Sequence, residues 1–241
     1  MTSGITFITA FYFIPENKKN NLEHYLTHIP NTFSQLKYQR VIFFYEDDQI
    51  LEYVNMYLET KDVFFLPIYL KLTDLPTYVL SAQLLECCKK QDTEYLKSIN
   101  DHKGVVHYQR EYLQSGEDSY RKVITIWTSK IGLMERVIYE NPFQTDTFAW
   151  VDVSISRINM QFVDIPFQQE KINTNICWAN YKGERMYHSG GFMISSINTW
   201  NRFIPIYNKK LEEIMEDPYA HDEETIFHLI HKENPDIFRH F

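Results

Sequence analysis

The sequence predicts a single α/β domain, residues 1–241, with a mostly parallel central sheet flanked by helices. The first observation is that several short runs, such as residues 40–45 (RVIFFY), are apolar throughout and do not alternate with polar residues. Strands that are buried on both faces have this pattern, which is typical of parallel sheets. The second is that segments with helical spacing of apolar residues separate these runs. The third is that 241 residues, 44% of them hydrophobic, without a linker or an internal repeat, suit one large core.

The strands are expected where apolar runs are rich in β-branched and aromatic residues. Residues 5–13 (ITFITAFYF) have this composition, and the later run TDTFAWVDV rises through Trp150 and Val151 before it meets Asp152. The expected strands are residues 5–13, 40–45, 62–68, 145–153, 175–180 and 190–196.

The helices are expected between and after these strands. Apolar residues recur at roughly helical spacing after the first strand, and Pro76 stands at a first helical turn, where proline is tolerated. The polar segment 89–120 is expected to be an insert of loops or loose helices. The expected helices are residues 15–36, 76–89, 123–141, 197–217 and 222–235.

The overall charge and the cysteines limit the classes of function. The formal net charge is -8, whereas a protein that binds nucleic acid usually has a basic surface, so nucleic acid is not an expected partner. Three cysteines, of which Cys87 and Cys88 are adjacent, do not make a disulfide framework and indicate a reducing compartment. The first residues lack the basic stretch of a signal peptide, and no apolar run is as long as a membrane span. We therefore expect a cytoplasmic protein without a transmembrane segment, in which Cys87 and Cys88 pack in the core.

Polar residues stand where several of the predicted strands end. In an open α/β sheet, ligands bind at the carboxyl ends of the strands. The residues at three such ends are Thr9 and Ala10, Tyr45 and Glu46, and Asp152 and Ser154. A carboxylate such as Asp152 after a buried run can hold Mg²⁺ or Mn²⁺ against substrate phosphates. The alternative is that Asp152 begins a turn or caps the next element.

Two later stretches and one lysine are further candidates. Gly190 and Gly191, in HSGG, leave room for a ligand to approach the backbone, although a plain bulge before a strand is the alternative. Asp222 and Glu223, in HDEET, stand at a predicted helix start, where they act either as helix caps or as a general base. Lys130 lies on a predicted helix. It either neutralises the charge of a bound pyrophosphate or is an ordinary surface lysine.

Five stretches, in this order, resemble a known family. They are TFITAFY, VIFFYED, residues 127–157 (WTSKIGLMERVIYENPFQTDTFAWVDVSISR), HSGGFMISS and DEETIF. The pattern is similar to that of the HtrL/YibB family of glycosyltransferases over about residues 5–230, most specifically in residues 127–157. The resemblance implies a single-domain, A-type glycosyltransferase fold. It also implies transfer of a sugar from a nucleotide sugar, here a UDP-sugar, to a hydroxyl of a glycan or other acceptor.

The resemblance also implies roles for individual residues. Asp152 takes the place of the first carboxylate of the family's D-x-D-type motif and Ser154 that of the second. These two are the implied ligands of Mn²⁺ or Mg²⁺, completed by a late residue such as His240. Asp222 or Glu223 is the implied base that takes the proton of the acceptor hydroxyl. The other implied contacts are with the nucleobase and ribose for Thr9, Ala10, Tyr45 and Glu46, with the diphosphate for Lys130, and with the sugar and acceptor for Ser189, Gly190 and Gly191.

Two other functions are compatible with the sequence. The absence of a second aspartate from the D-x-D position favours a domain of the same fold that binds a nucleotide sugar or glycan without turnover. A nucleotidyltransferase is the second alternative. That class commonly has a Gly-rich phosphate loop after its first strand, and the stretch TAFYFIPENKK contains no glycine.

Overall fold

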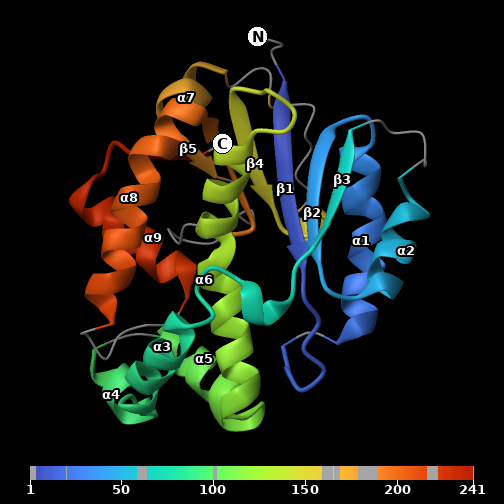
Figure 1. Ribbon diagram of the computed structural model, residues 1–241. Coiled ribbons are helices and arrows are strands. Elements are labelled where there is room, and N and C mark those ends of the chain that lie inside the picture. The colour runs from blue at the N-terminus through green and yellow to red at the C-terminus, as the bar shows by residue number, and fades with distance from the viewer. Residues whose placement is uncertain are drawn as a thin grey trace.

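Within the part of the chain that the computed structural model describes, seven strands form one sheet in the order β3-β2-β1-β4-β6-β5-β7 (Figure 1). Strands β3, β2, β1 and β4 are mutually parallel, β6 is antiparallel to both β4 and β5, and β7 is parallel to β5. The expected α/β architecture with a mostly parallel sheet is therefore confirmed. The described residues are 4–19, 21–58, 64–99, 102–158, 165, 169–178, 189–215 and 222–240.

The strands lie close to their expected positions. The second agrees at both ends, because its apolar run is bounded by Arg40 and by the acidic turn that begins at Glu46. Parts of the expected strands 62–68 and 175–180 lie outside the described residues. The strands are β1 Ile5–Phe11, β2 Arg40–Tyr45, β3 Phe65–Tyr69, β4 Thr147–Val151, β5 Ile176–Trp178, β6 Phe192–Ser196 and β7 Phe238–His240.

The helices cover both faces of this sheet. Figure 1 shows α6 running along one face with α8 and α9 beside it, while α1 and α2 lie on the other side of the sheet. The helices are α1 Leu22–Leu36, α2 Asp48–Asn55, α3 Leu80–Lys89, α4 Thr93–Ser98, α5 His102–His107, α6 Glu117–Glu140, α7 Gln169–Thr174, α8 Ile197–Ile214 and α9 Glu223–Glu233. The shorter helical segments are Leu72–Asp74, the π-helical segment Tyr108–Gln114 and Ile155–Ile158.

Two hydrophobic cores, one on each face, hold the layers together. Successive strand residues point to opposite faces, so Phe7 packs on one side of the sheet and Ile8 on the other. The first core joins Phe7 to Phe33 of α1, and the second joins Ile8 to Met134 of α6. Both faces of the central strands are buried, which explains why these strands are apolar throughout.

Helix ends account for most differences from the expected boundaries. Helix α1 begins at Leu22 and not at residue 15, because the side chain of Asn21 accepts a hydrogen bond from the His24 backbone N–H and so caps the helix there. Helix α6 begins six residues before the expected start, at Glu117. Helices α2 and α7 and strand β7 were not expected. The polar insert 89–120 consists largely of short helices, as expected.

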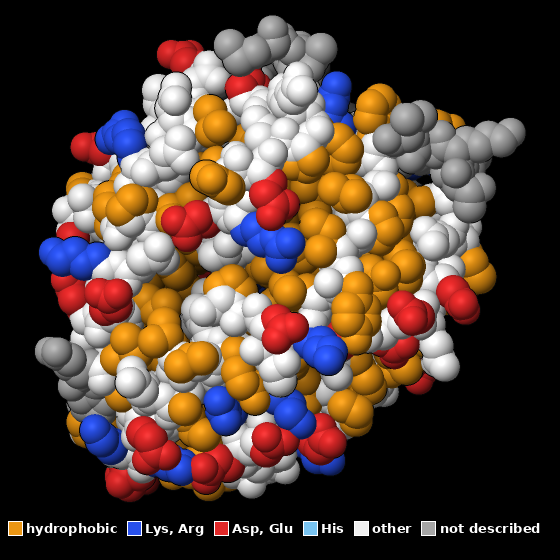
Figure 2. Space-filling model, viewed as in Figure 1, with side chains coloured by type: hydrophobic (Ala, Val, Ile, Leu, Met, Phe, Trp, Pro, Cys, Tyr) orange, Lys and Arg blue, Asp and Glu red, His pale blue; other side chains and the backbone are white. Residues whose placement is uncertain are grey.

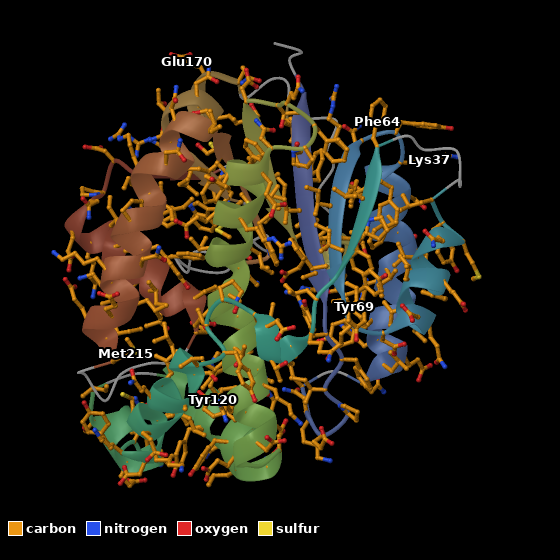
Figure 3. The ribbon with its side chains drawn as sticks, viewed as in Figure 1. Lys37, Phe64, Tyr69, Tyr120, Glu170 and Met215 are labelled. Atoms are coloured by element: carbon orange, nitrogen blue, oxygen red, sulfur yellow. The ribbon has the colours of Figure 1, made fainter. Side chains whose placement is uncertain are left out.

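The cysteines on α3 pack in the core, as expected. The Cys87 thiol donates a hydrogen bond to the backbone carbonyl of Met215, and the Cys88 thiol lies 3.6 Å from the hydroxyl of Tyr120. Figure 3 places Met215 and Tyr120 at the end of the molecule where α3 meets α6. Burial raises the pKa of the Cys88 thiol to about 12, so it is protonated and unreactive at neutral pH. No helix among the described residues is both long and apolar enough to span a membrane.

Candidate active site

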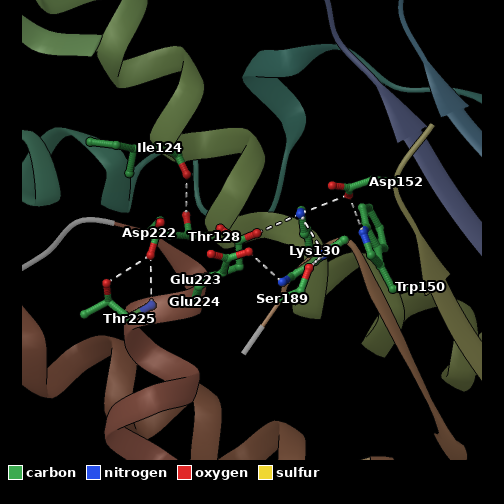
Figure 4. A network of polar contacts seen from close by, with 12 residues as sticks. Ile124, Thr128, Lys130, Trp150, Asp152, Ser189, Asp222, Glu223, Glu224 and Thr225 are labelled. Atoms are coloured by element: carbon green, nitrogen blue, oxygen red, sulfur yellow. Dashed lines mark hydrogen bonds and ion pairs between the residues drawn. The ribbon is translucent and has the colours of Figure 1, made fainter. Parts of the chain in front are cut away.

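The charge that follows the apolar strand β4 is balanced by a buried lysine. Strand β4 ends at Val151, and Asp152 is the first residue beyond it. The side chain of Lys130, on α6, is only 6% exposed, and its Nζ lies 3.0 Å from Asp152 Oδ1 and 2.7 Å from Glu223 Oε1. Nζ also donates a hydrogen bond of 2.9 Å to the carbonyl of Gly190 (Figure 4). Lys130 therefore ties the ends of β4, β6 and α9 to one point.

The Asp152 carboxylate is held in a fixed position and ionised. Its Oδ1 also accepts a 2.9 Å hydrogen bond from Trp150 Nε1, and its backbone N–H donates to the carbonyl of Gly191. Burial opposes ionisation, but Lys130 and Arg157 outweigh it and keep the pKa of Asp152 below its ordinary value. Asp152 therefore carries its negative charge at neutral pH, and its side chain is 23% exposed.

Glu223 stabilises Lys130 at the first turn of α9. Burial raises the pKa of Glu223 to about 7; Lys130 acts in the opposite direction, and the neighbouring Asp222 and Glu224 raise it further. A Cβ atom added at Gly190 would overlap the Glu223 carboxylate. The close approach that the sequence predicts at Gly190 is thus made, in the structure, by a side chain of the protein itself.

The rest of the HSGG stretch holds the start of β6 in place. The Gly190 N–H donates to Glu224 Oε1 at 2.9 Å, and the Gly191 N–H donates to Ser189 Oγ at 3.2 Å. Ser189, Gly190 and Gly191 are therefore brought close to Asp152 and Lys130, but they do not line the cavity described below.

Asp222 caps helix α9. Its Oδ1 accepts hydrogen bonds from the N–H and the hydroxyl of Thr225, at 2.8 and 3.0 Å, and its Oδ2 lies 3.7 Å from His107 Nδ1. The side chain is buried. Of the two roles that the sequence allows for Asp222, the geometry matches the helix cap.

The candidate residues on β1 and β2 do not gather at one place. Thr9 is fully buried, and its hydroxyl has no hydrogen-bond partner among the described residues. Tyr45 packs in the core, with its ring stacked on Phe43. Ala10 lines the cavity beside Asp152, whereas Glu46 lies at a second cavity and accepts a 2.7 Å hydrogen bond from the Leu72 N–H.

A cavity of about 120 Å³ lies at the carboxyl ends of β1 and β4. Three cationic side chains, Lys19, Lys130 and Arg157, and one carboxylate, Asp152, are the charged groups that line it. The chain as a whole carries a charge of -8, and Figure 2 shows both signs interspersed over one face of the molecule. An excess of positive charge inside an acidic protein indicates an anionic ligand.

Two of these cations were missed from the sequence. Lys19 follows β1 and Arg157 follows β4, so both obey the rule that ligands bind beyond the carboxyl ends of strands. Their positions within polar segments gave no further signal. A second cavity, of about 230 Å³, shares Phe13 and Ile14 with the first and extends to the ends of β2 and β3, where Glu46 lies.

Among the described residues, the expected metal site offers a divalent cation a single carboxylate, one oxygen of which is already in use. Asp152 Oδ1 is already bound by Lys130 and Trp150, and Ser154 is buried and offers only a hydroxyl. His240 lies on β7, three strands from β4, which is about 14 Å at the usual strand spacing. Among the described residues, no three His, Cys, Asp or Glu side chains gather in a way that could hold a metal ion.

No family model matches the chain, and no curated protein sequence matches it, so the resemblance to the HtrL/YibB family stays a prediction. Among solved structures, the chain is similar to the glycosyltransferase GlyE of Streptococcus pneumoniae TIGR4, with 10% identity and a TM-score of 0.49 over 100% of this chain and 46% of that one. It thus spans less than half of that protein's length. It is also similar to a transferase that carries two cysteine-to-serine substitutions, with 14% identity and a TM-score of 0.39 over 95% of this chain and 84% of that one. Likeness at this level assigns neither activity nor substrate, so the function proposed below rests on the site.

Proposed function

We propose that the chain is a glycosyltransferase that transfers a sugar from a nucleotide sugar, a UDP-sugar in the first instance, to a hydroxyl of a glycan or other acceptor. The observation that carries the proposal is the cavity at the ends of β1 and β4. Three cations line it, of which Lys130 is paired within the protein, together with one ionised carboxylate, in a protein whose net charge is -8. The stretches WVDVSISR and HSGG, on which the family resemblance depends, contribute residues to this cavity and to the network beside it.

Two electrostatic requirements of glycosyl transfer support the proposal. The bond between the anomeric carbon and the β-phosphate oxygen breaks, and its electron pair leaves with the nucleoside diphosphate. Positive side chains lower the cost of this negative charge. The sugar becomes oxocarbenium-like, and a carboxylate nearby stabilises it. Asp152, kept ionised by Lys130 and Arg157 and lining the cavity, would perform the second task. The acceptor oxygen then bonds to the anomeric carbon, and its proton passes to water.

The second cavity extends the site toward a nucleoside. It lies beyond the ends of β2 and β3 and shares its wall with the first. One carboxylate oxygen of Glu46 is used by the Leu72 N–H, which leaves the other for a ribose hydroxyl. The Tyr12 hydroxyl, buried in the wall of the first cavity, has no hydrogen-bond partner among the described residues. A donor with its nucleoside at Glu46 and its diphosphate and sugar near Asp152 would follow this path.

The test is release of nucleoside diphosphate from a panel of nucleotide sugars, with and without sugar acceptors. We expect the Asp152→Ala variant to lose turnover while it still unfolds cooperatively. Asp146→Ala, at the opposite end of the same strand, is the matched control and should keep turnover. Normal turnover by Asp152→Ala, or no turnover of any donor by the unmodified chain, would contradict the proposal.

A domain of the same fold that binds a nucleotide sugar without turnover is the second candidate. The two acidic residues expected to supply a base are both engaged within the protein, which favours this candidate. Asp222 caps α9, and Glu223 is paired with Lys130. Asp222→Asn and Glu223→Gln distinguish the two functions. Loss of turnover with unchanged donor binding would support a base at that residue. Donor binding by the unmodified chain without turnover of any donor would favour the binding domain.

A further inference from the structure

The three cations of the first cavity are not equivalent. Lys130 is neutralised by the protein, because its Nζ is bound by Asp152, Glu223 and the carbonyl of Gly190 (Figure 4). A buried ammonium whose hydrogen bonds are all used for the fold is poorly placed to bind a ligand as well. The charge available to a ligand must therefore come from the other two, Lys19 and Arg157.

Lys19 and Arg157 form no ion pair with any described residue. The Nε of Arg157 is buried without a hydrogen-bond partner among those residues. The ammonium of Lys19 lies 5.2 Å from the ring centroid of Trp127, which also lines the cavity. Two unpaired cations at one cavity repel each other, and a buried donor without an acceptor is costly. An anion with several oxygens would relieve both costs.

The fold anchors the backbone segments that carry both cations. The Lys19 N–H donates to Asn17 Oδ1 at 2.7 Å, and Asn17 Nδ2 donates to the fully buried Glu111 at 2.7 Å. Glu111 belongs to the π-helical segment of the polar insert, a rare geometry that is frequent at functional sites. The insert therefore positions the loop that carries Lys19.

Arg157 is fixed from the other side of the cavity. Its own N–H donates to the carbonyl of Ser154 in the turn after β4. The next residue toward β4, Ser156, bonds through its hydroxyl to His28 Nδ1 at 3.0 Å and through its N–H to Thr32 Oγ1 at 3.3 Å, both on α1. Lys19 and Arg157 thus come from two different loops that are each anchored to a helix.

We propose that Lys19 and Arg157 bind the diphosphate of the nucleotide donor directly, in place of the expected metal ion. Binding of the donor then needs no divalent cation. This inference rests on the proposed function. Its first support is that the described residues around Asp152 and Ser154 offer a metal ion only one carboxylate, whose Oδ1 is already bound by Lys130 and Trp150. Its second is that the cavity already holds two cations that form no ion pair with a described residue, and these would repel a divalent cation brought beside them. The negative charge of the departing nucleoside diphosphate is then met by an ammonium and a guanidinium.

Calorimetry with UDP tests the inference, in buffer with EDTA and in buffer with MnCl₂. We expect the same affinity in both. We expect Lys19→Gln and Arg157→Gln each to weaken binding roughly 10- to 100-fold in EDTA, as for the loss of a charge-assisted hydrogen bond. Arg157→Lys keeps the positive charge but loses the planar guanidinium that can form two hydrogen bonds with one phosphate, so this variant should bind UDP with intermediate affinity. Lys18→Gln and Arg202→Gln are the matched controls: both are exposed, lie outside the cavity and should bind as the unmodified chain does.

The outcomes separate this inference from the function on which it rests. UDP binding that requires Mn²⁺ and is lost in Asp152→Asn would overturn the inference and leave the glycosyltransferase proposal standing. UDP binding that neither Lys19→Gln nor Arg157→Gln weakens would also overturn it. If neither UDP nor any other nucleoside diphosphate binds in either buffer, both the inference and the proposed function are wrong.

Discussion

Replacement of Lys130 by methionine should cost much more stability than the same replacement at the surface. The Lys130 side chain is 6% exposed and compensates two carboxylates, at 2.7 and 3.0 Å. Removal of one partner from a buried ion pair costs about 3–5 kcal/mol, because a charge is left without compensation. Lys209 makes one pair with Glu213 at 3.5 Å, and its side chain is 79% exposed. A pair of this kind contributes at most about 0.5 kcal/mol, so Lys209→Met is the matched control.

The cost of Lys130→Met should also depend on pH. Without the ammonium, the pKa values of Asp152 and Glu223 rise, so both carboxyl groups become neutral in mildly acidic buffer and the uncompensated charge disappears. The difference in free energy of unfolding between Lys130→Met and the unmodified chain should therefore be larger at about pH 8 than at about pH 5.

The assay is urea unfolding followed by circular dichroism at both pH values. A Lys130→Met variant that is within about 1 kcal/mol of Lys209→Met at about pH 8 would refute the buried network. If Lys130→Met does not fold, the double variant Lys130→Met/Glu223→Gln, which removes one of the two stranded charges, should recover folding. A double variant that is no more stable than the single one would count against the network equally.

Three further predictions follow from the structure. Gly190→Ala should destabilise the chain by about 1–3 kcal/mol, because the added methyl group overlaps Glu223. In thermal unfolding, Gly190→Ala should lose more stability than Gly191→Ala, because a Cβ atom at Gly191 would have its nearest neighbouring atom 3.3 Å away. Burial raises the pKa of Glu223 from 4.5 to about 7, so the proton on this carboxyl group stabilises the folded chain below pH 4.5, and that stabilisation is lost as the pH rises through 7. In the Glu223→Gln variant, the free energy of unfolding should therefore fall less between pH 4.5 and 7. An unchanged dependence of the free energy of unfolding on pH would contradict the assignment. Cys87→Ser should leave turnover of a nucleotide sugar unchanged, because Cys87 packs away from both cavities, whereas a large loss in a folded variant would place the thiol at the site.

The sheet was predictable because its central strands are buried on both faces. A strand such as Arg40–Tyr45 has six residues of which five are buried, and a short apolar run rich in aromatic and β-branched residues before an acidic turn is typical of a strand in a covered sheet. Strand β7 was not predictable, since Phe238–His240 has one buried residue and is defined only by its pairing with β5. That pairing depends on where the chain leaves α9, and the position of α9 depends on the whole fold.

The site was predictable only in part, for a similar reason. Asp152 was found because a carboxylate after an apolar run is conspicuous, and its partner Lys130 was placed near it only through the resemblance. Their direct pairing comes from α6 packing across the sheet. Lys19 and Arg157 stand in polar segments where a cation is ordinary, so the sequence gives no reason to select them. They become notable once the fold shows that both line one cavity and that the Nε of Arg157 is buried without a hydrogen-bond partner among the described residues.

The division of charges in the site has a consequence for mutants. Lys130, Glu223 and Asp222 use their charges to join α6, α9 and β4, so their loss should appear first in stability. Lys19 and Arg157 are carried by loops beyond β1 and β4, and no ion pair within the described residues depends on them. Their removal should lower affinity for a diphosphate while leaving the fold intact. A diphosphate that binds these charges in the folded chain but not in the unfolded chain should in turn stabilise the fold, and that gain should shrink when Lys19 or Arg157 is replaced.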